Sequence, residues 1–261
     1  CSHYSSDCDL LVHLTDVHTG VGSDNYFNKF NDEVLKSRLE EYLEQIFEVR
    51  DRHKAENCYL VIGEIISGLI HNILRIEQNE DVIEQFKVAS TLICDFIKYL
   101  CEGFDTVHVY VTAGNHSRII ADKKDSLEGE NFDYLFPFFA SARLQNCGNL
   151  VIHENNIDSS VAMFSIRGNV VMSVHGDKDK PESVVDDLTQ YFHMRPNIVL
   201  MGHLHTNGYH TENDTKVIQS GTIAGTDSYA MSKRLRNKPE QTISVITEDG
   251  LSCIYDVKFK T

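Results

Sequence analysis

The sequence predicts an α/β fold, and three observations carry that prediction. In the first half of the chain, short apolar segments of strand length alternate with amphipathic segments of helical period. The second half changes to shorter apolar strands with one intervening helix. The chain has 261 residues, 41% of them hydrophobic, which suits one large domain or two small ones. We expect two sheets packed together with helices outside them, in a single domain.

The first half of the chain alternates strands and helices. Buried strands are predicted at residues 9–14, 58–62 and 107–112. Apolar residues at three- and four-residue steps predict amphipathic helices over residues 27–47 and 82–103. A further helix is predicted over residues 131–144, where Pro137 either kinks the helix or begins a new one.

Shorter strands dominate the second half. They are predicted at residues 150–153, 161–166, 169–174, 197–201 and 216–219. Pro181 is predicted to open a helix that ends at Phe192, because proline suits the first helical turn. Residues 242–258 alternate apolar and polar side chains around Glu248-Asp249-Gly250, which is typical of a hairpin.

The charge balance is acidic, with 24 Lys and Arg against 39 Asp and Glu and a formal net charge of −15. This balance argues against loose, non-specific binding of nucleic acid, but it does not exclude a phosphate substrate. One local exception is a basic segment that is either a solvated loop or a contact for phosphates, formed by Lys233, Arg234, Arg236 and Lys238. The longest apolar run, residues 59–70, is too short to cross a bilayer, so we expect no membrane partner.

The seven cysteines are scattered and contain no Cys-x-x-Cys pair. This pattern favours reduced core thiols in a cytoplasmic protein over a disulfide framework or a zinc ribbon. The first residues are polar, unlike a signal peptide, and the chain begins at Cys1. We therefore expect residues 1–8 to be the remnant of a longer chain and residues 9–261 to form the domain.

Five of the predicted strands end in side chains that can bind metal, usually beside a glycine. In open α/β sheets the ligand crevice lies at the carboxyl ends of the strands, so these five ends should converge. Each motif alone has an ordinary explanation as a turn or loop. Together, and always at strand ends, they predict a metal site. The motifs are Asp16-x-His18, Gly63-Glu64, Gly114-Asn115-His116, His175-Gly176-Asp177 and Gly202-His203-Leu204-His205.

In this order the motifs resemble those of the calcineurin-like metallophosphoesterase superfamily, whose pattern is D-x-H, G-D, G-N-H, a lone H and G-H-x-H. The resemblance spans residues 16 to 205. It implies a four-layer α/β/β/α sandwich that holds a centre of two divalent metal ions. The ligands contain imidazole, carboxylate and amide but no thiolate, so we expect Mn²⁺, with Fe or Zn as alternatives.

The resemblance also implies a role for each motif residue. A hydroxide between the two ions would attack the phosphorus atom. His116 would act as the general acid that protonates the leaving oxygen. Glu64 would bridge the two ions. The remaining ligands would be Asp16, His18 and His205 for the first ion, and Asn115, His175 and His203 for the second.

Glu64 departs from the pattern, because the superfamily has aspartate at the bridging position. The added methylene moves the carboxylate by more than ~1 Å, whereas such sites tolerate roughly 0.5 Å. Three alternatives follow: the site has adapted to glutamate, the bridge is impaired, or the residue was introduced to disable an enzyme. From the sequence alone, Glu64→Asp is expected to raise activity.

Three further residues are weaker candidates. Asp177 could orient a ligand histidine or cap the following helix. Arg118 could hold a substrate phosphate or be a solvated loop residue. His71 could contact substrate or be an ordinary packed or surface histidine.

Within the superfamily, the motifs look closer to the DNA repair exonuclease branch, including phage-type members, than to protein phosphatases. Protein phosphatases resemble G-D-x-V-D-R-G and G-N-H-E, and this chain lacks that arginine and that glutamate. We expect a metal-dependent phosphodiesterase that acts on DNA. The alternatives are a phosphodiesterase for a nucleotide or cyclic nucleotide, and a catalytically weakened metal-binding scaffold. The resemblance further implies an ATPase or another replication or repair protein as partner, a homodimer, and the cytoplasm of a bacterial or phage-infected host cell.

Overall fold

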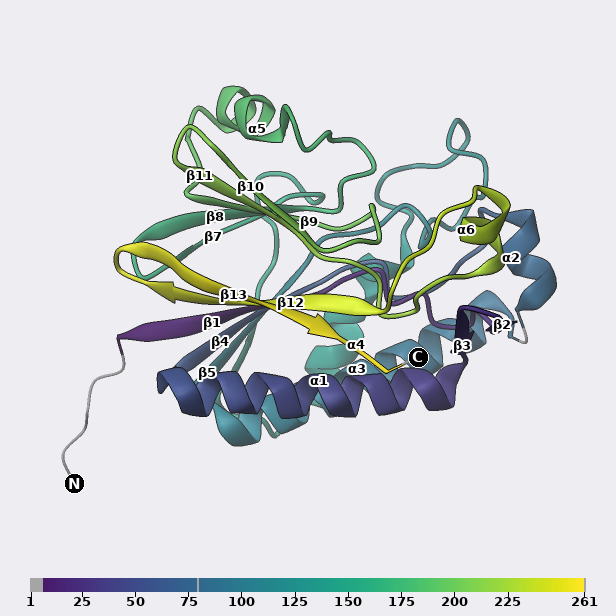
Figure 1. Cartoon of the computed structure of the whole chain (residues 1–261), viewed down its shortest axis with the longest axis horizontal. Helices are drawn as coiled ribbons and strands as arrows, with labels where there is room; N and C mark the ends of the chain where they lie inside the picture. Colours follow the sequence, from purple (N-terminus) through teal and green to yellow (C-terminus); the bar gives the residue numbers. More distant parts are fainter. Residues whose placement is uncertain (1–6, 79, 261) are drawn as a thin grey trace.

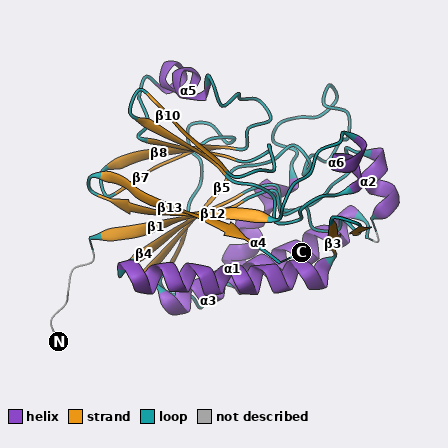
Figure 2. Cartoon of the chain, in the orientation of Figure 1, coloured by secondary structure: helices purple, strands orange, loops and turns teal. Residues whose placement is uncertain are grey.

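Two β-sheets pack face to face between two layers of helices in the computed structural model, which describes residues 7–78 and 80–260 (Figure 1). The predicted four-layer α/β/β/α arrangement is therefore confirmed. Figure 2 shows the helices outside the strands and the long loops at one end of the sheets. Residues 1–6 of the predicted N-terminal remnant lie outside the described residues.

The first sheet has the strand order β13-β12-β1-β4-β5-β6. Its strands β1, β4, β5 and β6 run parallel, while β12 is antiparallel to β1. The bounds are β1 (Cys8–Leu14), β4 (Asn57–Ile62), β5 (Thr106–Val111), β6 (Leu150–Ile152), β12 (Glu240–Thr247) and β13 (Gly250–Lys258). Every residue of β1 is buried, because helices cover one face of the sheet and the second sheet covers the other.

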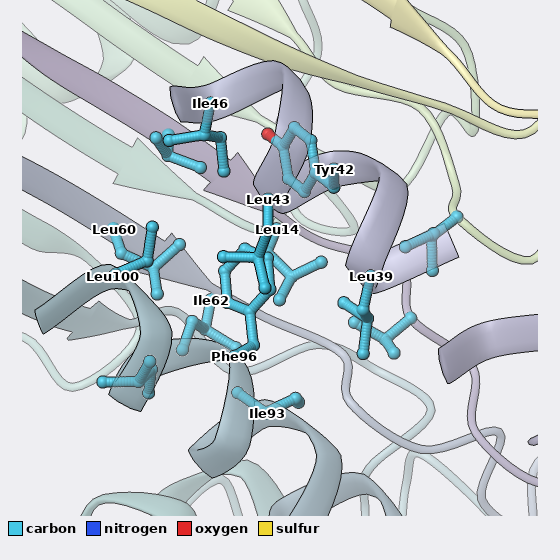
Figure 3. Close-up of a cluster of buried hydrophobic side chains, with 14 of the residues drawn as sticks. Leu14, Leu39, Tyr42, Leu43, Ile46, Leu60, Ile62, Ile93, Phe96 and Leu100 are labelled. Atoms are coloured by element: carbon cyan, nitrogen blue, oxygen red, sulfur yellow. The ribbon is translucent and has the colours of Figure 1, made fainter. Parts of the chain in front are cut away.

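Helices α1 (Asp32–His53) and α3 (Val82–Gly103) cover the outer face of this sheet, together with the short 3₁₀ helix Phe132–Leu135 and α4 (Phe136–Arg143). Figure 3 shows Tyr42 of α1 and Phe96 of α3 packed over the strand residue Leu14. The rings of Tyr42 and Phe96 stack with their centroids 5.9 Å apart.

The second sheet has the order β10-β11-β9-β8-β7, in which β8, β9 and β11 run parallel. The bounds are β7 (Ala162–Ile166), β8 (Asn169–Val174), β9 (Ile198–Met201), β10 (Gly208–Glu212) and β11 (Thr215–Gln219). Helix α5 (Val184–Phe192) covers its outer face through Val184, Val185 and Leu188. On its inner face, Ile198 and Leu200 pack with residues of the first sheet.

Two predicted helix starts were wrong. Helix α1 begins at Asp32, because Asn31 caps it by accepting a hydrogen bond from the Val34 N–H, 2.9 Å away. The preceding residues form a hairpin of β2 (Ser23–Asn25) and β3 (Asn28–Phe30). Helix α5 begins at Val184, after a turn that contains Pro181. Pro137 does begin a new helix, since it lies in the first turn of α4.

The sequence also missed some short elements. These are α2 (Asn72–Glu77), α6 (Ser228–Ser232), β2, β3 and β10. The predicted buried thiols are present at Cys58 and Cys94. In the described part of the chain, every helix is too short or too polar to cross a membrane.

Arg38 of α1 ties the hairpin and a distant loop to the helical layer. Its guanidinium is buried and donates hydrogen bonds to the Ile223 and Ala224 carbonyls at 2.8 and 2.9 Å. It also donates to Asn28 Oδ1 of the hairpin at 2.9 Å. Because these acceptors come from two different segments, Arg38 fixes the loop that precedes α6 against the hairpin.

Candidate metal centre

The predicted ligands converge at one edge of the two sheets. They follow the carboxyl ends of β1, β4 and β5 in the first sheet and of β8 and β9 in the second. The ligand atoms of Asp16, His18, Glu64 and His205 all lie within 4.8 Å of one another. Ligand atoms around one cation have this kind of spacing, so these four residues form a candidate metal centre.

The first predicted ligand set is closely packed. Asp16 Oδ1 lies 3.1 Å from His205 Nε2 and 3.8 Å from His18 Nε2. The two imidazole nitrogens, Nε2 of His18 and Nε2 of His205, are 3.2 Å apart. Metal–ligand distances of about 2.0–2.2 Å put neighbouring ligands of one ion roughly 3–3.5 Å apart, so these three side chains fit a common ion.

The second predicted set lies beside the first. His175 Nε2 is 3.2 Å from Asn115 Oδ1, and the rings of His175 and His203 have centroids 5.2 Å apart. Glu64 Oε2 lies 3.2 Å from His175 Nε2 and 3.6 Å from His18 Nε2, so it sits between the two sets. This oxygen is buried and makes no hydrogen bond with any described residue, as expected for an atom that binds metal.

The charges of this site favour bound cations. Burial opposes ionisation of Asp16, yet His18 and His205 hold its pKa well below the usual range. Burial likewise opposes a charged His175, but Glu64 and Asp16 raise its pKa to about 10. Buried carboxylates thus stay ionised and draw positive charge onto neighbouring imidazoles. Divalent cations would supply that charge, so the donor set fits the metals that the sequence predicts.

Glu64 is accommodated by its surroundings. Its Oε1 accepts a hydrogen bond from the His116 backbone N–H, with 2.6 Å between nitrogen and oxygen. A Cβ at Gly114 would lie only 2.5 Å from Glu64 Cβ, so a glycine is needed beside this side chain. With Oε1 held in this way, Oε2 still reaches both ligand sets. These contacts favour the first alternative, a site adapted to glutamate.

Five predicted ligands have left-handed backbone conformations that non-glycine residues seldom adopt. Their φ angles are 51° at Asp16, 51° at His18, 49° at Glu64, 65° at His203 and 57° at His205. Such conformations persist only where the surrounding structure enforces them, and they concentrate at functional sites.

Asp133 holds the Glu64 and His116 loops together, and the sequence did not identify it. Its carboxylate is buried and accepts hydrogen bonds from the backbone N–H groups of Glu64, Ile65 and Gly114 at 2.8–3.1 Å. It also accepts one from the Ser117 hydroxyl at 2.7 Å. The one sequence signal was an acidic residue at the start of a predicted helix, which ordinarily indicates capping.

A second set of hydrogen bonds holds the turn at Asp16. Gln241 accepts from the Thr15 N–H at 2.9 Å and donates to the Thr15 carbonyl at 3.0 Å. Thr222 donates its hydroxyl to the Asp16 carbonyl at 2.8 Å. A Cβ at Gly202 would lie 2.5 Å from Asp16 Oδ2, so the glycine lets the β9 loop approach this carboxylate. Residues from β12 and from the loop between β11 and α6 thus also position the site.

His116 lies beside the ligands, with its ring centroid 4.6 Å from that of His18. Its Nδ1–H donates to the Ser67 carbonyl at 2.9 Å, which leaves Nε2 for other contacts. Burial lowers the pKa of His116 to about 3, so the ring is neutral at pH 7.

The three weaker candidates lie around the centre. Arg118 and Asp177 line a cavity of about 550 Å³ that also reaches Asn115 and His175. Arg118 donates to the Ala121 carbonyl at 2.9 Å, and Asp177 pairs with Lys123 Nζ at 3.5 Å. Asp177 does not cap a helix, because α5 begins at Val184. His71 does not line this cavity, and its ring centroid lies 4.9 Å from that of His116.

Several solved structures match most of the chain at low sequence identity. Vacuolar protein sorting 29 from Cryptosporidium parvum is 13% identical with a TM-score of 0.47, over 97% of this chain and 99% of that one. An archaeal phosphodiesterase is 11% identical with a TM-score of 0.44, over 96% and 99%. A hypothetical protein from Pyrococcus horikoshii is 12% identical with a TM-score of 0.48, over 96% and 88%.

No curated protein sequence matches the chain. The family model for calcineurin-like phosphoesterases matches residues 10–221, a span that contains every motif from Asp16 to His205. The chain therefore belongs to the calcineurin-like phosphoesterase family.

Proposed function

We propose that the chain is a two-metal phosphodiesterase that hydrolyses phosphodiester bonds of DNA, with a nucleotide or cyclic nucleotide as the second candidate substrate. The position of Glu64 carries this proposal, because its Oε2 lies within 3.6 Å of one imidazole from each ligand set. Membership of the calcineurin-like phosphoesterase family supports the reaction class, hydrolysis of phosphate esters.

Glu64 would be shared by the two ions. The other ligands would be Asp16, His18 and His205 for the first, and Asn115, His175 and His203 for the second. Imidazole, amide and carboxylate ligands without thiolate suit Mn²⁺, with Fe or Zn as alternatives. When bound, the cations would stabilise charge on the phosphoryl oxygens and lower the pKa of the attacking water.

His116 would hold the proton that the leaving oxygen receives. The Ser67 carbonyl accepts the hydrogen bond from Nδ1 and so fixes the ring, which leaves Nε2 to carry that proton. The neutral state of the free ring at pH 7 is compatible with this role, because an anionic phosphoryl oxygen beside Nε2 would raise the pKa of His116.

The preference for DNA rests on the motifs that separate this chain from protein phosphatases. Gly114-Asn115-His116 is followed by Ser117, without the glutamate of the phosphatase pattern. The cavity of about 550 Å³ beside Asn115 and His175 has room for a nucleoside, which supports both DNA and nucleotide substrates. A metal-binding scaffold is the non-catalytic alternative.

The test of this function combines metal content with turnover. The Mn²⁺-loaded protein should contain two ions per chain by elemental analysis and hydrolyse bis(p-nitrophenyl) phosphate. His203→Ala should empty the second site and His205→Ala the first, because each removes a direct ligand. His210→Ala, on β10, is the matched control and should keep both ions. No turnover with Mn²⁺, Fe²⁺ or Zn²⁺ would favour the scaffold.

His116→Ala should keep both ions and lose rate according to the leaving group. On esters with a poor leaving group, the loss should be about 10²–10⁴-fold, the usual share of general acid catalysis. On bis(p-nitrophenyl) phosphate the loss should be smaller, because nitrophenolate needs little protonation. Steady-state kinetics on both substrates measure the difference, and loss of metal from the variant would contradict the assigned role.

Glu64→Asp should lower phosphodiesterase activity by at least about tenfold, in contrast to the expectation from the sequence alone. The shorter side chain withdraws both oxygens from the His116 N–H and from the two histidines, and misplacement by about 1 Å can lower a rate on the order of a hundredfold. Activity and metal occupancy should be measured together. A faster aspartate variant with both ions bound would show that glutamate impairs the bridge.

Asp133→Asn should weaken metal binding about 10–100-fold without removing a ligand, the range observed when groups that orient metal ligands are changed. An amide cannot accept all the hydrogen bonds that the Asp133 carboxylate accepts, so the two loops lose their relative positions. Titration calorimetry with Mn²⁺ measures the change, and melting followed by circular dichroism reports folding. Asp125→Asn, on an exposed loop, is the control.

A further inference from the structure

A continuous series of ring contacts leads from His116 to the protein surface. The His71 ring lies 4.9 Å from that of His116, and its other neighbour is Tyr229 of α6, stacked at 4.1 Å between centroids with 22° between the planes. Lys233 Nζ lies 5.8 Å from the centre of the Tyr229 ring. Through these contacts, the surface beyond His71 is connected to the candidate centre.

The basic segment singled out in the sequence continues this series. Lys233, Arg234 and Arg236 are exposed, and none of them forms an ion pair within the described ranges 7–78 and 80–260. The Arg236 guanidinium carbon lies 5.2 Å from the centre of the Phe27 ring. Three cations without carboxylate partners stand out on a chain with a net charge of −15.

Two exposed aromatic rings, which contact each other, lie next to Arg236, the last of these cations. Tyr26 is 93% exposed and Phe27 is 36% exposed, and their rings meet edge to face at 5.1 Å. Both belong to the turn between β2 and β3, where Asn25 Oδ1 accepts from the Phe27 N–H at 2.9 Å. Packing gives no reason for so exposed a ring at Tyr26. A solvent-facing ring beside cations is a platform on which a base can stack.

Hydrogen bonds join the segments that carry these cations and rings. Thr226 and Asn237 close the loop that carries the cations: the Thr226 hydroxyl donates to the Asn237 carbonyl at 2.7 Å and accepts from the Asn237 N–H at 3.0 Å. Asn25 donates to the Thr226 carbonyl at 3.1 Å, which joins the hairpin to the loop. Ser228 donates to Glu77, which joins α6 to α2. Figure 1 shows α2, α6 and the hairpin together at one end of the molecule.

We propose that this basic aromatic strip, formed by Tyr26, Phe27, Lys233, Arg234 and Arg236, binds a single-stranded segment of nucleic acid. The phosphates would contact the three cations, and an unpaired base would stack on Tyr26. The strip would thus lead the strand toward His116. The inference rests on the proposed phosphodiesterase function for its purpose, but strand binding itself requires no catalysis.

The chemistry favours a single strand over a duplex or a membrane. Exposed ring faces bind unpaired bases, whereas the bases of a duplex are already stacked on each other. The acidic remainder of the protein repels a duplex or an anionic bilayer, both of which present charge over a wide area, but a narrow strand can follow the strip. Contact with about three phosphates predicts a shallow salt dependence, with a slope of log K on log salt near −2.

Fluorescence anisotropy with a labelled 12-residue oligothymidylate tests the proposal on the full chain in EDTA, so that hydrolysis plays no part. We expect Lys233→Ala/Arg236→Ala and Tyr26→Ala each to raise Kd about tenfold, and Tyr26→Phe to bind like wild type because stacking is retained. Lys98→Ala, on the exposed face of α3, is the charge control. Melting temperatures verify that the variants are folded.

Several outcomes would overturn the proposal. These are binding by the variants equal to wild type, a hairpin duplex bound as tightly as the single strand, or no oligonucleotide binding at 50 mM salt. Strip-dependent binding of phosphatidylserine vesicles in place of the oligonucleotide would identify a membrane surface instead. Turnover of bis(p-nitrophenyl) phosphate, measured in parallel, tests the proposed function separately, because that substrate is too small to need the strip.

Discussion

The left-handed turns at the strand ends are the constraint on which the site depends. A strand that continued in extended conformation would carry Asp16, Glu64 and His203 past the centre, whereas a positive φ turns each residue back toward it. Each such turn is unfavourable for a residue with a Cβ, by about 1–3 kcal/mol, so neighbouring contacts must enforce it. Asp133 does so for the Glu64 loop through backbone hydrogen bonds, and Gln241 and Thr222 do so for the turn at Asp16.

The two sheets contribute different parts of the centre, so its geometry depends on their packing. Asp16, His18, Glu64, Asn115 and His116 follow strands of the first sheet, whereas His175, His203 and His205 follow strands of the second. Glu64, the proposed shared ligand, comes from the first sheet and lies 3.2 Å from His175 of the second. The apolar layer between the sheets, which includes Leu11, Val61 and Leu200, fixes this distance. A protein interior is close-packed, so this layer allows the two sheets little movement relative to each other.

The convergence of the candidate ligands could be predicted from the sequence, because they lie in short motifs at the ends of apolar runs, and parallel strands align their carboxyl ends. The β2–β3 hairpin could not, because Phe27 and Phe30 continue the helical spacing of the following residues, and only the Asn25 and Asn31 side chains end that pattern. Asp133 and Gln241 could not be predicted for a related reason. Each side chain accepts a hydrogen bond from a backbone N–H far away in the sequence: Asp133 from Gly114, 19 positions away, and Gln241 from Thr15, 226 positions away. No local sequence pattern indicates such distant partners.

The distribution of charge connects the centre to its surroundings. Two carboxylates facing two divalent cations would leave the centre positive by about two charges, within a protein whose net charge is −15. With those cations bound, an anionic substrate would meet repulsion over most of the surface and attraction at one place. Lys233, beside Tyr229, would extend that attractive region outward from His71 and His116, where a leaving group would depart. Under the proposed function, the acidic surface elsewhere would disfavour ligands that spread their charge over a broad surface relative to those that present it along a narrow path.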